Sequence, residues 1–600
     1  MLDPQKTLKK FKKNWRIVAL VFLAISFFIT TSYFNYKTQE FQKKDGQGVD
    51  FVKWTSPDET ANYVFSKYYS QENKLSITEN YNLIAKDIMR PRSFRSDNGE
   101  IKPVSFLGII LVYGTIAKIF SYRIIPFLTP FFGAIGLIFF YLLNKKLFSK
   151  ENAFLSVFVL AFFPPYVYYT VRSMFHNVLF VVFLIIGLYF SVRMVEKMET
   201  ETKKTLLNGL LYSALGGLFV GLAVVTRTSE LMWILPVLLI ILVFNLKKIG
   251  IYKLLVFLIF LFVSLSPVLH YNKVLYGAPL SGGYSEMNSS IQNLKDSGAK
   301  MLKTTVTGDF KKYSGIVNEV KKTLFYFGIH PRQSFHMFKY YFVQMFGWLF
   351  WVGLAGITLF AIKYKKSKKR HWVYLFSWLV LSFILIIYYG SWTFYDNPDP
   401  RSHTIGNSYT RYWLPVYLGI IPFFVYFVSQ ITRIVGKFLA SKKEKINNKF
   451  FHLYISKAFL ANSFRAIIVI LIFFWSANFL LAGSEEGLVF LYQKSLKTKS
   501  EWQSLIKLTE SNSVLITRYH DKLVFPERKV IVGDFNDKNM NIIYADLAGR
   551  LPVYYYNFSL RKIDIKYLND KKFKELGIQI KEVKKITNDF TLYKIVKLVN

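Results

Sequence analysis

The sequence predicts an all-α polytopic membrane protein with about eleven transmembrane helices and a small C-terminal extracytoplasmic α/β domain. Of its 600 residues, 52% are hydrophobic and 18% are aromatic, and the mean hydropathy is +0.25. Soluble chains carry only ~45–50% apolar residues even when glycine is counted, so a soluble multidomain enzyme is excluded. The basic residues lie mostly between long apolar runs. The net charge of +41 is therefore expected to orient helices in a bilayer and not to bind nucleic acid.

The first apolar run, Ile17–Phe34, predicts a membrane anchor near the N-terminus. It follows a cluster of Lys and Arg residues and has no small-residue cleavage site, so we expect an uncleaved helix whose start is cytoplasmic. Ten further runs approach the ~20 residues that a helix needs to cross a hydrocarbon core of ~30 Å. They are Ile125–Leu143, Ala153–Tyr169, Met174–Val192, Leu206–Val225, Thr228–Asn245, Tyr252–Leu269, Phe342–Ile362, Trp372–Tyr389, Trp413–Val428 and Ala466–Leu481.

Loop charge predicts which side of the membrane each loop occupies. If the eleven runs alternate in direction, every cytoplasmic connection carries several Lys or Arg residues. The run Val104–Phe120 would invert all later loops if it crossed, and it is short and carries Lys118. We therefore expect Val104–Phe120 to be an interfacial or re-entrant helix. The N-terminus is then cytoplasmic and the C-terminus extracytoplasmic, in a multi-pass protein of the cell membrane.

The same alternation places three long polar segments outside the membrane. They are a loop over residues 35–123, a second loop over residues 270–341, and everything after Gly483. In the tail, short strand-like runs alternate with helical stretches, which indicates a small α/β domain. The expected domains are a transmembrane domain over residues 1–485 and an extracytoplasmic α/β domain over residues 486–600.

Ionisable residues outside the basic loops gather at the outer ends of the apolar runs. They are Asp58, Glu59, Glu100, Lys102, Arg172, Arg227, Glu230, His270 and Arg411. Channels and ion-coupled transporters place such residues in the middle of helices, where they are costly and usually functional. The pattern in this chain favours a site on the outer surface of the bundle over a pore. The absence of cysteine excludes a cysteine nucleophile, thiolate metal ligands and disulfides.

Five segments follow one another in a specific order and sidedness. The first outer loop opens with a paired Asp-Glu in Ser56–Thr60, and Glu100–Pro103 puts a Lys-Pro turn before the short interfacial helix. Gly217–Glu230 ends a helix in Thr-Arg, Pro267–Tyr284 leaves the membrane after the seventh span, and Tyr409–Pro415 begins a late helix. Together they resemble the GT-C glycosyltransferases that use polyprenyl-phosphate sugars. Within these they most resemble glycosyltransferase family 39, the protein O-mannosyltransferases and the lipid A aminoarabinose transferases.

The resemblance covers about residues 10–485 and implies a GT-C fold and a sugar-transfer activity. The enzyme would move a single sugar, a mannose-like hexose or an aminopentose, from a polyprenyl-phosphate donor to an extracytoplasmic acceptor. That acceptor would be a protein hydroxyl, a glycolipid or a wall polymer. Because the phosphate leaving group is already activated, one carboxylate suffices as general base and transfer inverts the anomeric centre. Asp58 is the expected base, and Glu59 is its partner or the alternative base.

The resemblance also implies cations that stabilise the charge on the departing phosphate. The expected phosphate-binding residues are Lys102, Arg172, Arg227, Arg411 and Tyr412. Glu100 and His270 could together hold a divalent metal ion, since both ligand types suit zinc. No acidic residue closely follows Arg172, although many relatives have one at that turn. The loop over residues 270–341 is too short for the β-rich insert of eukaryotic O-mannosyltransferases, so a prokaryotic membrane enzyme is the better match.

Structural roles stay open for these residues, as do other functions for the chain. A surface Asp-Glu pair before a helix is ordinarily an N-terminal cap, and cations at membrane borders commonly anchor helices at the interface. A transporter or flippase of lipid-linked sugars should carry midplane charges or broken helices, which are sparse here. An oligosaccharyltransferase should carry a Trp-Trp-Asp signature, but no Trp-Trp pair occurs. A noncatalytic protein of cell-envelope assembly could carry the same binding residues.

Overall fold

The computed structural model describes residues 4–39, 52–196, 203–284, 328–363, 368–397, 399, 401–443, 457–483 and 485–598. The chain packs into two compact units, and each unit is built from three separate segments. The helical unit comprises Met1–Phe34, Phe127–Pro267 and Ser289–Leu488. The α/β unit comprises Asn35–Pro126, Val268–Asn288 and Val489–Asn600. The domain boundary expected between residues 485 and 486 stays a prediction.

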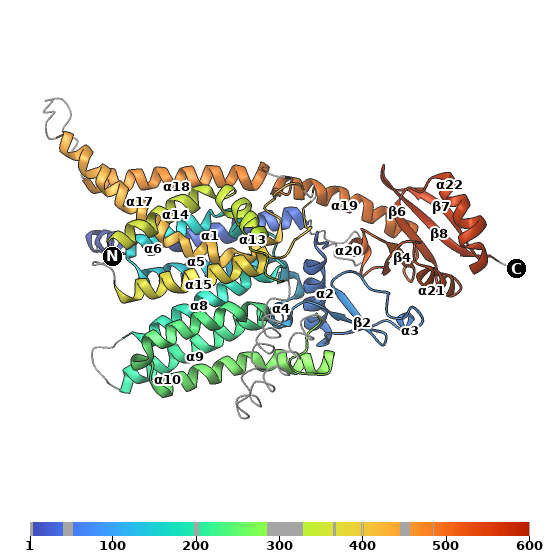
Figure 1. Ribbon diagram of the computed structural model, residues 1–600, viewed down its shortest axis with the longest axis horizontal. Helices are drawn as coiled ribbons and strands as arrows, with labels where there is room; N and C mark the ends of the chain where they lie inside the picture. The colour runs from blue at the N-terminus through green and yellow to red at the C-terminus, as the bar shows by residue number, and fades with distance from the viewer. Residues whose placement is uncertain are drawn as a thin grey trace, which may run out of the picture. The chain divides into compact units, whose positions relative to one another are not determined.

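Long helices that lie side by side make up the helical unit (Figure 1). Its helices are α1 (Pro4–Gln39), α5 (Ile125–Leu147), α6 (Lys150–Ala161), α7 (Pro164–Val171), α8 (His176–Val195), α9 (Lys203–Thr226), α10 (Leu231–Tyr276), α13 (Pro331–Phe338), α14 (Gly347–Ile362), α15 (Lys369–Gly390), α16 (Ser408–Tyr412), α17 (Leu414–Lys443) and α18 (Lys457–Ala482). A short 3-10 turn, η2 (Thr228–Glu230), joins α9 to α10, and a π-helical turn, η4 (Lys339–Gln344), follows α13. The ends of α1, α5 and α10 extend beyond the limits of the unit.

Eight helices in the described ranges are long and apolar enough to span a membrane, or up to ten if each of two bent pairs is one span. Helices α6 and α7 bend by 53°, because Pro164 and Pro165 begin α7 and a proline cannot continue the preceding helix. Helix α10 is counted once, yet Gly250 interrupts it with φ 67° and ψ 161°, so it consists of two helices. Each of the eleven predicted runs therefore coincides with one helix, one half of α10 or one bent pair. The chain is an all-α polytopic membrane protein, as the sequence predicts.

Glycines allow neighbouring helices of the unit to approach closely. A Cβ atom built on Gly217 of α9 would lie 2.0 Å from the carbonyl oxygen of Phe257 in α10. A Cβ atom on Gly356 of α14 would lie 2.1 Å from the carbonyl oxygen of Phe423 in α17. Small residues at helix contacts are the usual basis of packing in membranes, where apolar burial alone gives little preference between protein and lipid. The first contact holds α9 against α10, with Arg227 at the turn that joins them, and the second holds α14 against α17.

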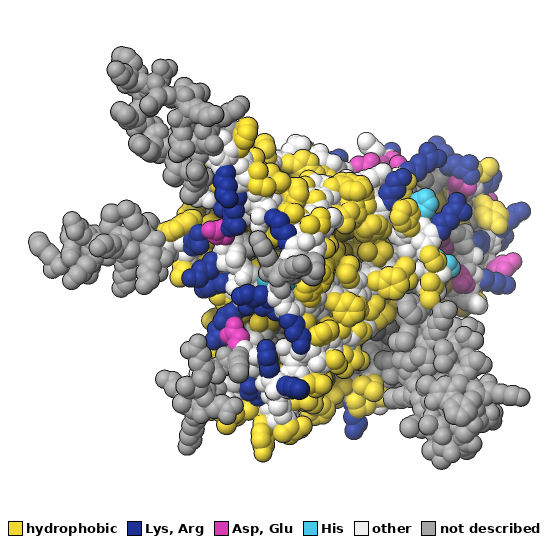
Figure 2. Space-filling model, turned by 60° about the vertical axis from the view of Figure 1, so that its left-hand side comes forward, with side chains coloured by type: hydrophobic (Ala, Val, Ile, Leu, Met, Phe, Trp, Pro, Cys, Tyr) yellow, Lys and Arg dark blue, Asp and Glu magenta, His cyan; other side chains and the backbone are white. Residues whose placement is uncertain are grey.

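Large hydrophobic side chains cover the flank of the helical bundle, and Lys and Arg side chains gather at one end of it (Figure 2). Phe22 on α1 is 72% exposed, and Tyr252 on α10 and Phe383 on α15 are similarly exposed. An exposed apolar surface of this kind on a soluble protein would cause aggregation, whereas lipid chains cover it favourably in a membrane.

The α/β unit contains two small sheets and the helices around them. Its first part has α2 (Pro57–Glu72), β1 (Ile77–Thr78), α3 (Tyr81–Ile84), β2 (Phe94–Asp97), β3 (Glu100–Pro103), α4 (Leu107–Ile119) and the 3-10 turn η1 (Tyr122–Ile124). Strands β1, β3 and β2 form an antiparallel sheet in that order. Helix α4 falls within the run Val104–Phe120 and is a short apolar helix, not counted among the spans. Its thirteen residues rise only ~20 Å, less than a hydrocarbon core requires.

The tail folds as an α/β structure, as the sequence predicts. It contains α19 (Leu488–Leu508), β4 (Val514–Thr517), α20 (Asp521–Val524), β5 (Lys529–Val532), α21 (Lys538–Ala548), β6 (Val553–Phe558), α22 (Lys562–Tyr567), the short turns η6 (Leu568–Lys572) and η7 (Lys574–Leu576), β7 (Ile578–Lys585) and β8 (Phe590–Lys597). The strand order is β5-β4-β6-β8-β7, in which β4 is parallel to both β5 and β6. Strand β8 is antiparallel to β6 and β7. Strands β4, β5 and β6 coincide with the strand-like sequence runs Ser513–Thr517, Lys529–Val532 and Val553–Tyr556, whereas the β7–β8 hairpin was not predicted.

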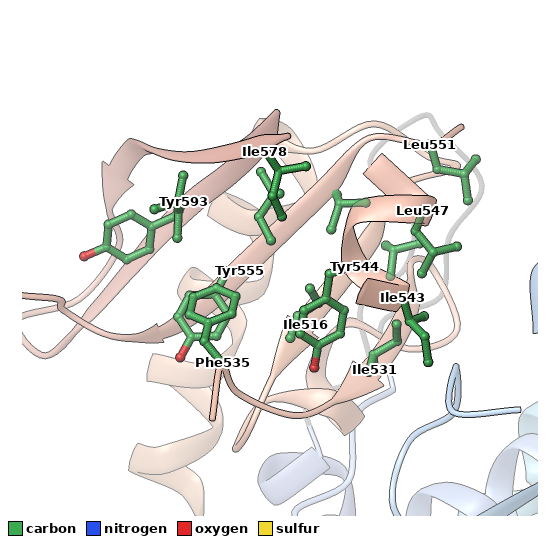
Figure 3. Close-up of a cluster of buried hydrophobic side chains, with 14 of the residues drawn as sticks. Ile516, Ile531, Phe535, Ile543, Tyr544, Leu547, Leu551, Tyr555, Ile578 and Tyr593 are labelled. Atoms are coloured by element: carbon green, nitrogen blue, oxygen red, sulfur yellow. The ribbon is translucent and has the colours of Figure 1, made fainter. Parts of the chain in front are cut away.

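Buried apolar side chains from the strands and from α21 form the core of the tail sheet (Figure 3). Ile516 and Ile531 come from the parallel strands, and Tyr544 and Leu547 come from α21. Ala85 and Met89 of the first outer loop belong to the same buried cluster, although they precede the strands of the tail by more than 400 residues. The first outer loop and the tail therefore fold together around one core.

Ion pairs join the same two segments of the α/β unit. The Nζ atom of Lys53 lies 2.5 Å from Glu527, and Lys529 pairs with Glu79. The Lys53 ammonium is buried, and burial lowers its pKa while the Glu527 carboxylate acts in the opposite direction. These contacts tie the first residue of β5, and the segment just before it, to the outer loop.

Candidate functional site

The predicted carboxylate pair lies at the start of α2 in the α/β unit, and the two carboxylates have different surroundings. Glu59 is fully buried, and its Oε2 accepts hydrogen bonds from the Ser56 amide at 3.0 Å and from the Thr55 hydroxyl at 3.3 Å. This is the capping function that a Glu at the third helical position performs. Asp58 is partly exposed, and its Oδ1 accepts a 2.7 Å hydrogen bond from the Ser93 hydroxyl. Asp58 is therefore the more accessible carboxylate of the pair.

The segment that contacts Asp58 is fixed by the tail. Ser93 has φ 63°, an uncommon conformation for a residue with a side chain. Its neighbour Arg92 binds Asp521, which is fully buried: the Arg92 amide donates to Oδ2 at 2.8 Å and the guanidinium approaches Oδ1 to 2.5 Å. The partners of Asp521 lower its pKa, although burial alone raises it. A connection therefore runs from Asp521 through Arg92 and Ser93 to Asp58.

Lys522, the residue after Asp521, adds a positive charge that interacts with Glu59. The pKa of Lys522 is lowered to about 8, first by burial and then by the positive charge of Arg92, while Asp521 and Glu59 act in the opposite direction. Sequence reasoning missed Asp521 and Lys522, because a His-Asp-Lys turn in a tail more than 400 residues from Asp58 carries no local signal.

Lys102 lies on β3 among charged side chains of the same sheet. It is 9% exposed, and its Nζ atom is 3.3 Å from Glu100 Oε2 and 4.0 Å from Asp97 Oδ2. Asp97 also pairs with Arg95 at 2.7 Å. The positive charge of Lys102 is thus shared with two carboxylates, so an anion near it would compete with both.

The two weak metal candidates do not form a recognisable metal centre. Glu100 pairs with Lys102, and His270 is exposed near the end of α10. Among the described residues there is no group of three or more His, Asp or Glu side chains that could hold a metal ion. The identity of any metal ligand stays a prediction.

Three predicted arginines from distant parts of the sequence meet in the helical unit. Arg172 directly follows α7, Arg227 lies between α9 and η2, and Arg411 is on α16. The Phe175 ring lies 4.9 Å from Cζ of Arg172 and 4.2 Å from Cζ of Arg411. The Tyr412 ring lies 5.1 Å from Cζ of Arg411 and 4.6 Å from Cζ of Arg227. We call these five residues the arginine cluster.

Carboxylates balance part of the charge in the arginine cluster. Glu230 is 2% exposed, and its Oε1 accepts a 2.9 Å hydrogen bond from Arg227 Nε. It also accepts hydrogen bonds from the Tyr389 hydroxyl at 2.7 Å and the Trp233 indole at 2.5 Å. Tyr389 accepts a hydrogen bond from Arg227 Nη2 at 3.0 Å, which closes a ring of contacts. Arg227 therefore has a buried structural partner, which the sequence did not reveal.

Arg411 has a different arrangement at the start of α16. Its Nη2 donates a 2.7 Å hydrogen bond to the Ser408 hydroxyl, which in turn donates to Asp396. The guanidiniums of Arg172 and Arg411 both lie over the Phe175 ring, and this contact orients them before any ligand binds. Oriented guanidiniums are the side chains best suited to planar, bidentate contact with phosphate oxygens.

The predicted residues thus fall into two groups. Asp58, Glu59, Glu100, Lys102 and His270 belong to the α/β unit. The helical unit contains Arg172, Arg227, Arg411 and Tyr412, and the structure brings all four together in the arginine cluster. Sequence reasoning missed Phe175 of the cluster and Tyr389, which contacts Arg227 and Glu230, since the chain has 59 Phe and 40 Tyr residues and neither stands out.

Residues 105–271 match the family model described as dolichyl-phosphate-mannose-protein mannosyltransferase. The matched stretch includes Arg172, Arg227 and His270 and excludes Asp58 and Arg411. It confirms, for this part of the chain, the family resemblance that the sequence motifs indicate. No curated protein matches the sequence as a relative.

Solved structures share the fold of this chain at low sequence identity. The apo oligosaccharyltransferase of Archaeoglobus fulgidus matches with a TM-score of 0.52 and 13% identity, over 94% of this chain and 71% of that one. ArnT of Cupriavidus metallidurans in the apo state matches with a TM-score of 0.48 and 10% identity, over 95% of this chain and 97% of that one. The first match shows the shared fold, and the predicted GT-C fold is confirmed.

Proposed function

We propose that this chain is a membrane glycosyltransferase that moves a single sugar from a polyprenyl-phosphate donor to an extracytoplasmic acceptor. The arginine cluster is the observation that carries the proposal. Three arginines separated by 55 and 184 residues along the chain converge on two aromatic rings. Cations buried at the ends of membrane helices are costly and usually functional, and a lipid-linked phosphate is the ligand that a positively charged site beside a bilayer suits.

The proposed reaction uses few groups of the protein. The acceptor hydroxyl attacks the anomeric carbon while the bond from that carbon to the phosphate oxygen breaks, so the sugar is transferred with inversion. The carboxylate of Asp58 takes the hydroxyl proton, and Glu59 holds the first turn of α2. The guanidiniums of Arg172 and Arg411 stabilise the negative charge that the leaving phosphate retains. The sugar is a mannose-like hexose or an aminopentose in this proposal.

The proposal also includes an orientation, with the N-terminus in the cytoplasm and the C-terminus outside. Because the chain has no cysteine, single cysteines can report on sidedness without interference. We expect a membrane-impermeant maleimide to label Ser511→Cys in intact cells and to label Lys146→Cys only after permeabilisation. Labelling of Lys146→Cys in intact cells, with Ser511→Cys protected, would reverse the orientation.

The donor site is tested with two alanine variants. We expect Arg411→Ala and Lys102→Ala to weaken the affinity for a polyprenyl-phosphate hexose by about 10–100-fold each, because each removes a charge-assisted contact worth ~1.5–3 kcal/mol. Arg433→Ala is the matched control, since Arg433 is an exposed arginine that pairs with Glu151 elsewhere in the helical unit. Affinity is measured by titrating radiolabelled donor into purified protein.

The same labelled donor distinguishes the proposed function from its alternatives. Wild-type protein incubated with donor and host membrane extract is expected to pass the label to an acceptor. Movement of intact donor between leaflets of a vesicle, without transfer, would identify a flippase. Binding without transfer or movement would favour a noncatalytic assembly protein. Unchanged donor affinity in both alanine variants would mean that Arg411 and Lys102 have structural roles alone.

A further inference from the structure

The tail sheet has a topological switch point that the proposed reaction does not use. Strand β4 lies between β5 and β6 and is parallel to both. The chain leaves β4 toward β5 on one side through α20, and it leaves β5 through α21 to reach β6 on the other side of β4. In open α/β sheets, ligands bind outside the carboxyl ends of the strands at such a reversal.

A cleft of about 540 Å³ lies at this position. Residues from the loops after two of the parallel strands line it: Arg518 and Tyr519 after β4, and Phe535 after β5. The end of β6, with the residues before and within α22, completes the wall and includes Asn557 and Tyr567. The topology and the shape of the surface thus indicate the same site independently.

The floor of the cleft is rigid and aromatic. Phe535 and Tyr555 both line it, and their ring centroids are 4.1 Å apart. Both belong to the buried cluster of the tail (Figure 3), so the floor is anchored in the core. A floor that is already ordered costs little conformational entropy when a ligand binds.

The rim of the cleft exposes aromatic rings that a folded domain would ordinarily bury. Phe558 is 53% exposed, Tyr567 is 55% exposed and Tyr519 is 42% exposed, and all three line the cleft. Exposed aromatic rings around a concave site indicate binding of a ligand with apolar faces. The C–H faces of pyranose rings are surfaces of this kind, and they stack on aromatic side chains.

Four charged groups of the cleft form two pairs, and Lys572 is a fifth charged group that lines it. Arg561 contacts Asp564 at 2.9 Å, and Arg518 approaches Asp534 to 3.5 Å. Pairing of both guanidiniums reduces the attraction that the cleft would exert on an anion such as free phosphate. The paired groups, with Asn557, still supply donors and acceptors for hydroxyl groups. The combination suits a neutral, polyhydroxylated ligand better than a charged one.

We infer that this cleft is a carbohydrate-binding site, and that it holds the glycan part of the acceptor. The role as an acceptor site rests on the proposed function, whereas carbohydrate binding does not. The cleft belongs to the same compact unit as Asp58, because the first outer loop and the tail share one core. A glycan held by this cleft is therefore bound by the unit that carries the proposed general base.

Full-length protein in nanodiscs, without donor, tests the inference by saturation-transfer NMR with three soluble probes: mannotetraose, N-acetylglucosamine tetraose and inorganic phosphate. We expect at least one of the two oligosaccharides to bind. Arg518→Ala and Tyr567→Ala are each expected to raise the Kd for the bound oligosaccharide by at least tenfold, since each removes a contact at the rim. Both side chains are more than half exposed, so neither substitution should change thermal stability.

Arg550→Ala is the matched control, because Arg550 is an exposed arginine at the amino-terminal side of β6. The Kd of this variant for the oligosaccharide should stay within twofold of the wild-type value. Failure of both oligosaccharides to bind, or equal Kd values in the cleft variants and wild type, would overturn the inference. Displacement of the oligosaccharide by phosphate would show an anion site and would also overturn it. Protein that binds glycan but transfers no sugar would contradict the proposed function alone. Protein that transfers sugar without binding either oligosaccharide would contradict this inference alone.

Discussion

Asp58→Asn is expected to leave the protein folded and to lower the rate of sugar transfer by about 10²–10⁴-fold. The amide of asparagine keeps the size of the side chain and can still accept the hydrogen bond from Ser93. Ser56 is the N-cap of α2, so losing the Asp58 charge from the first turn costs only ~0.3–1 kcal/mol of helix stabilisation. What the asparagine side chain loses is the ability to take a proton from the acceptor hydroxyl. The measurement is initial transfer rate at matched expression and matched thermal stability.

Glu59→Gln is the matched comparison for this prediction, because the structure gives the two carboxylates different tasks. Glutamine can still accept the hydrogen bonds from the Ser56 amide and Thr55, as glutamine does at the same position of other capping boxes. We therefore expect a loss of less than tenfold, due to the missing charge opposite Lys522. A larger loss in Glu59→Gln than in Asp58→Asn would reverse the two roles. Near-normal transfer by both variants would remove the catalytic role of the pair.

The helices of this chain were predictable because a bilayer imposes a simple requirement. Each span needs a continuous apolar segment, and each of the eleven predicted runs coincides with a helical segment or a bent pair. The tail was harder to predict. Strand β7 carries five exposed residues at its end, Lys581–Lys585, so its sequence lacks the strict alternation of a half-buried strand. The β7–β8 hairpin depends on pairing with β6, which is a tertiary contact.

The candidate site was predictable only in part, for a physical reason. The sidedness expected from loop charge would place Arg172, Arg227 and Arg411 at the same membrane face, so sequence alone favours a common role. The rings that join them have no distinctive sequence signal, because aromatic residues are common throughout this chain. The support of Asp58 by Asp521 was not predictable either. It arises from folding of the first outer loop and the tail around one core, which local patterns do not encode.

Arg227→Ala is expected to destabilise the helical unit by about 3–5 kcal/mol, the usual cost of removing one partner from a buried ion pair. The substitution leaves Glu230 buried, with Tyr389 and Trp233 as its hydrogen-bond donors but with no guanidinium beside it. Glu230 must then take up a proton or keep an unbalanced charge. Thermal unfolding in detergent should show the loss as a clear drop in Tm.

A double variant separates this structural role of Arg227 from a role in phosphate binding. In Arg227→Met/Glu230→Gln the buried charges are removed together, so most of the lost stability should return, because replacing a whole buried pair is commonly neutral. Donor affinity in that variant then reports on Arg227 without interference from unfolding. If Arg227 acts mainly through Glu230, the double variant binds donor nearly as well as wild type, and Arg172 and Arg411 carry the phosphate contact. If the double variant is stable but has lost donor affinity by tenfold or more, Arg227 itself binds phosphate. Full stability of Arg227→Ala would contradict the buried ion pair as the reason for this arginine.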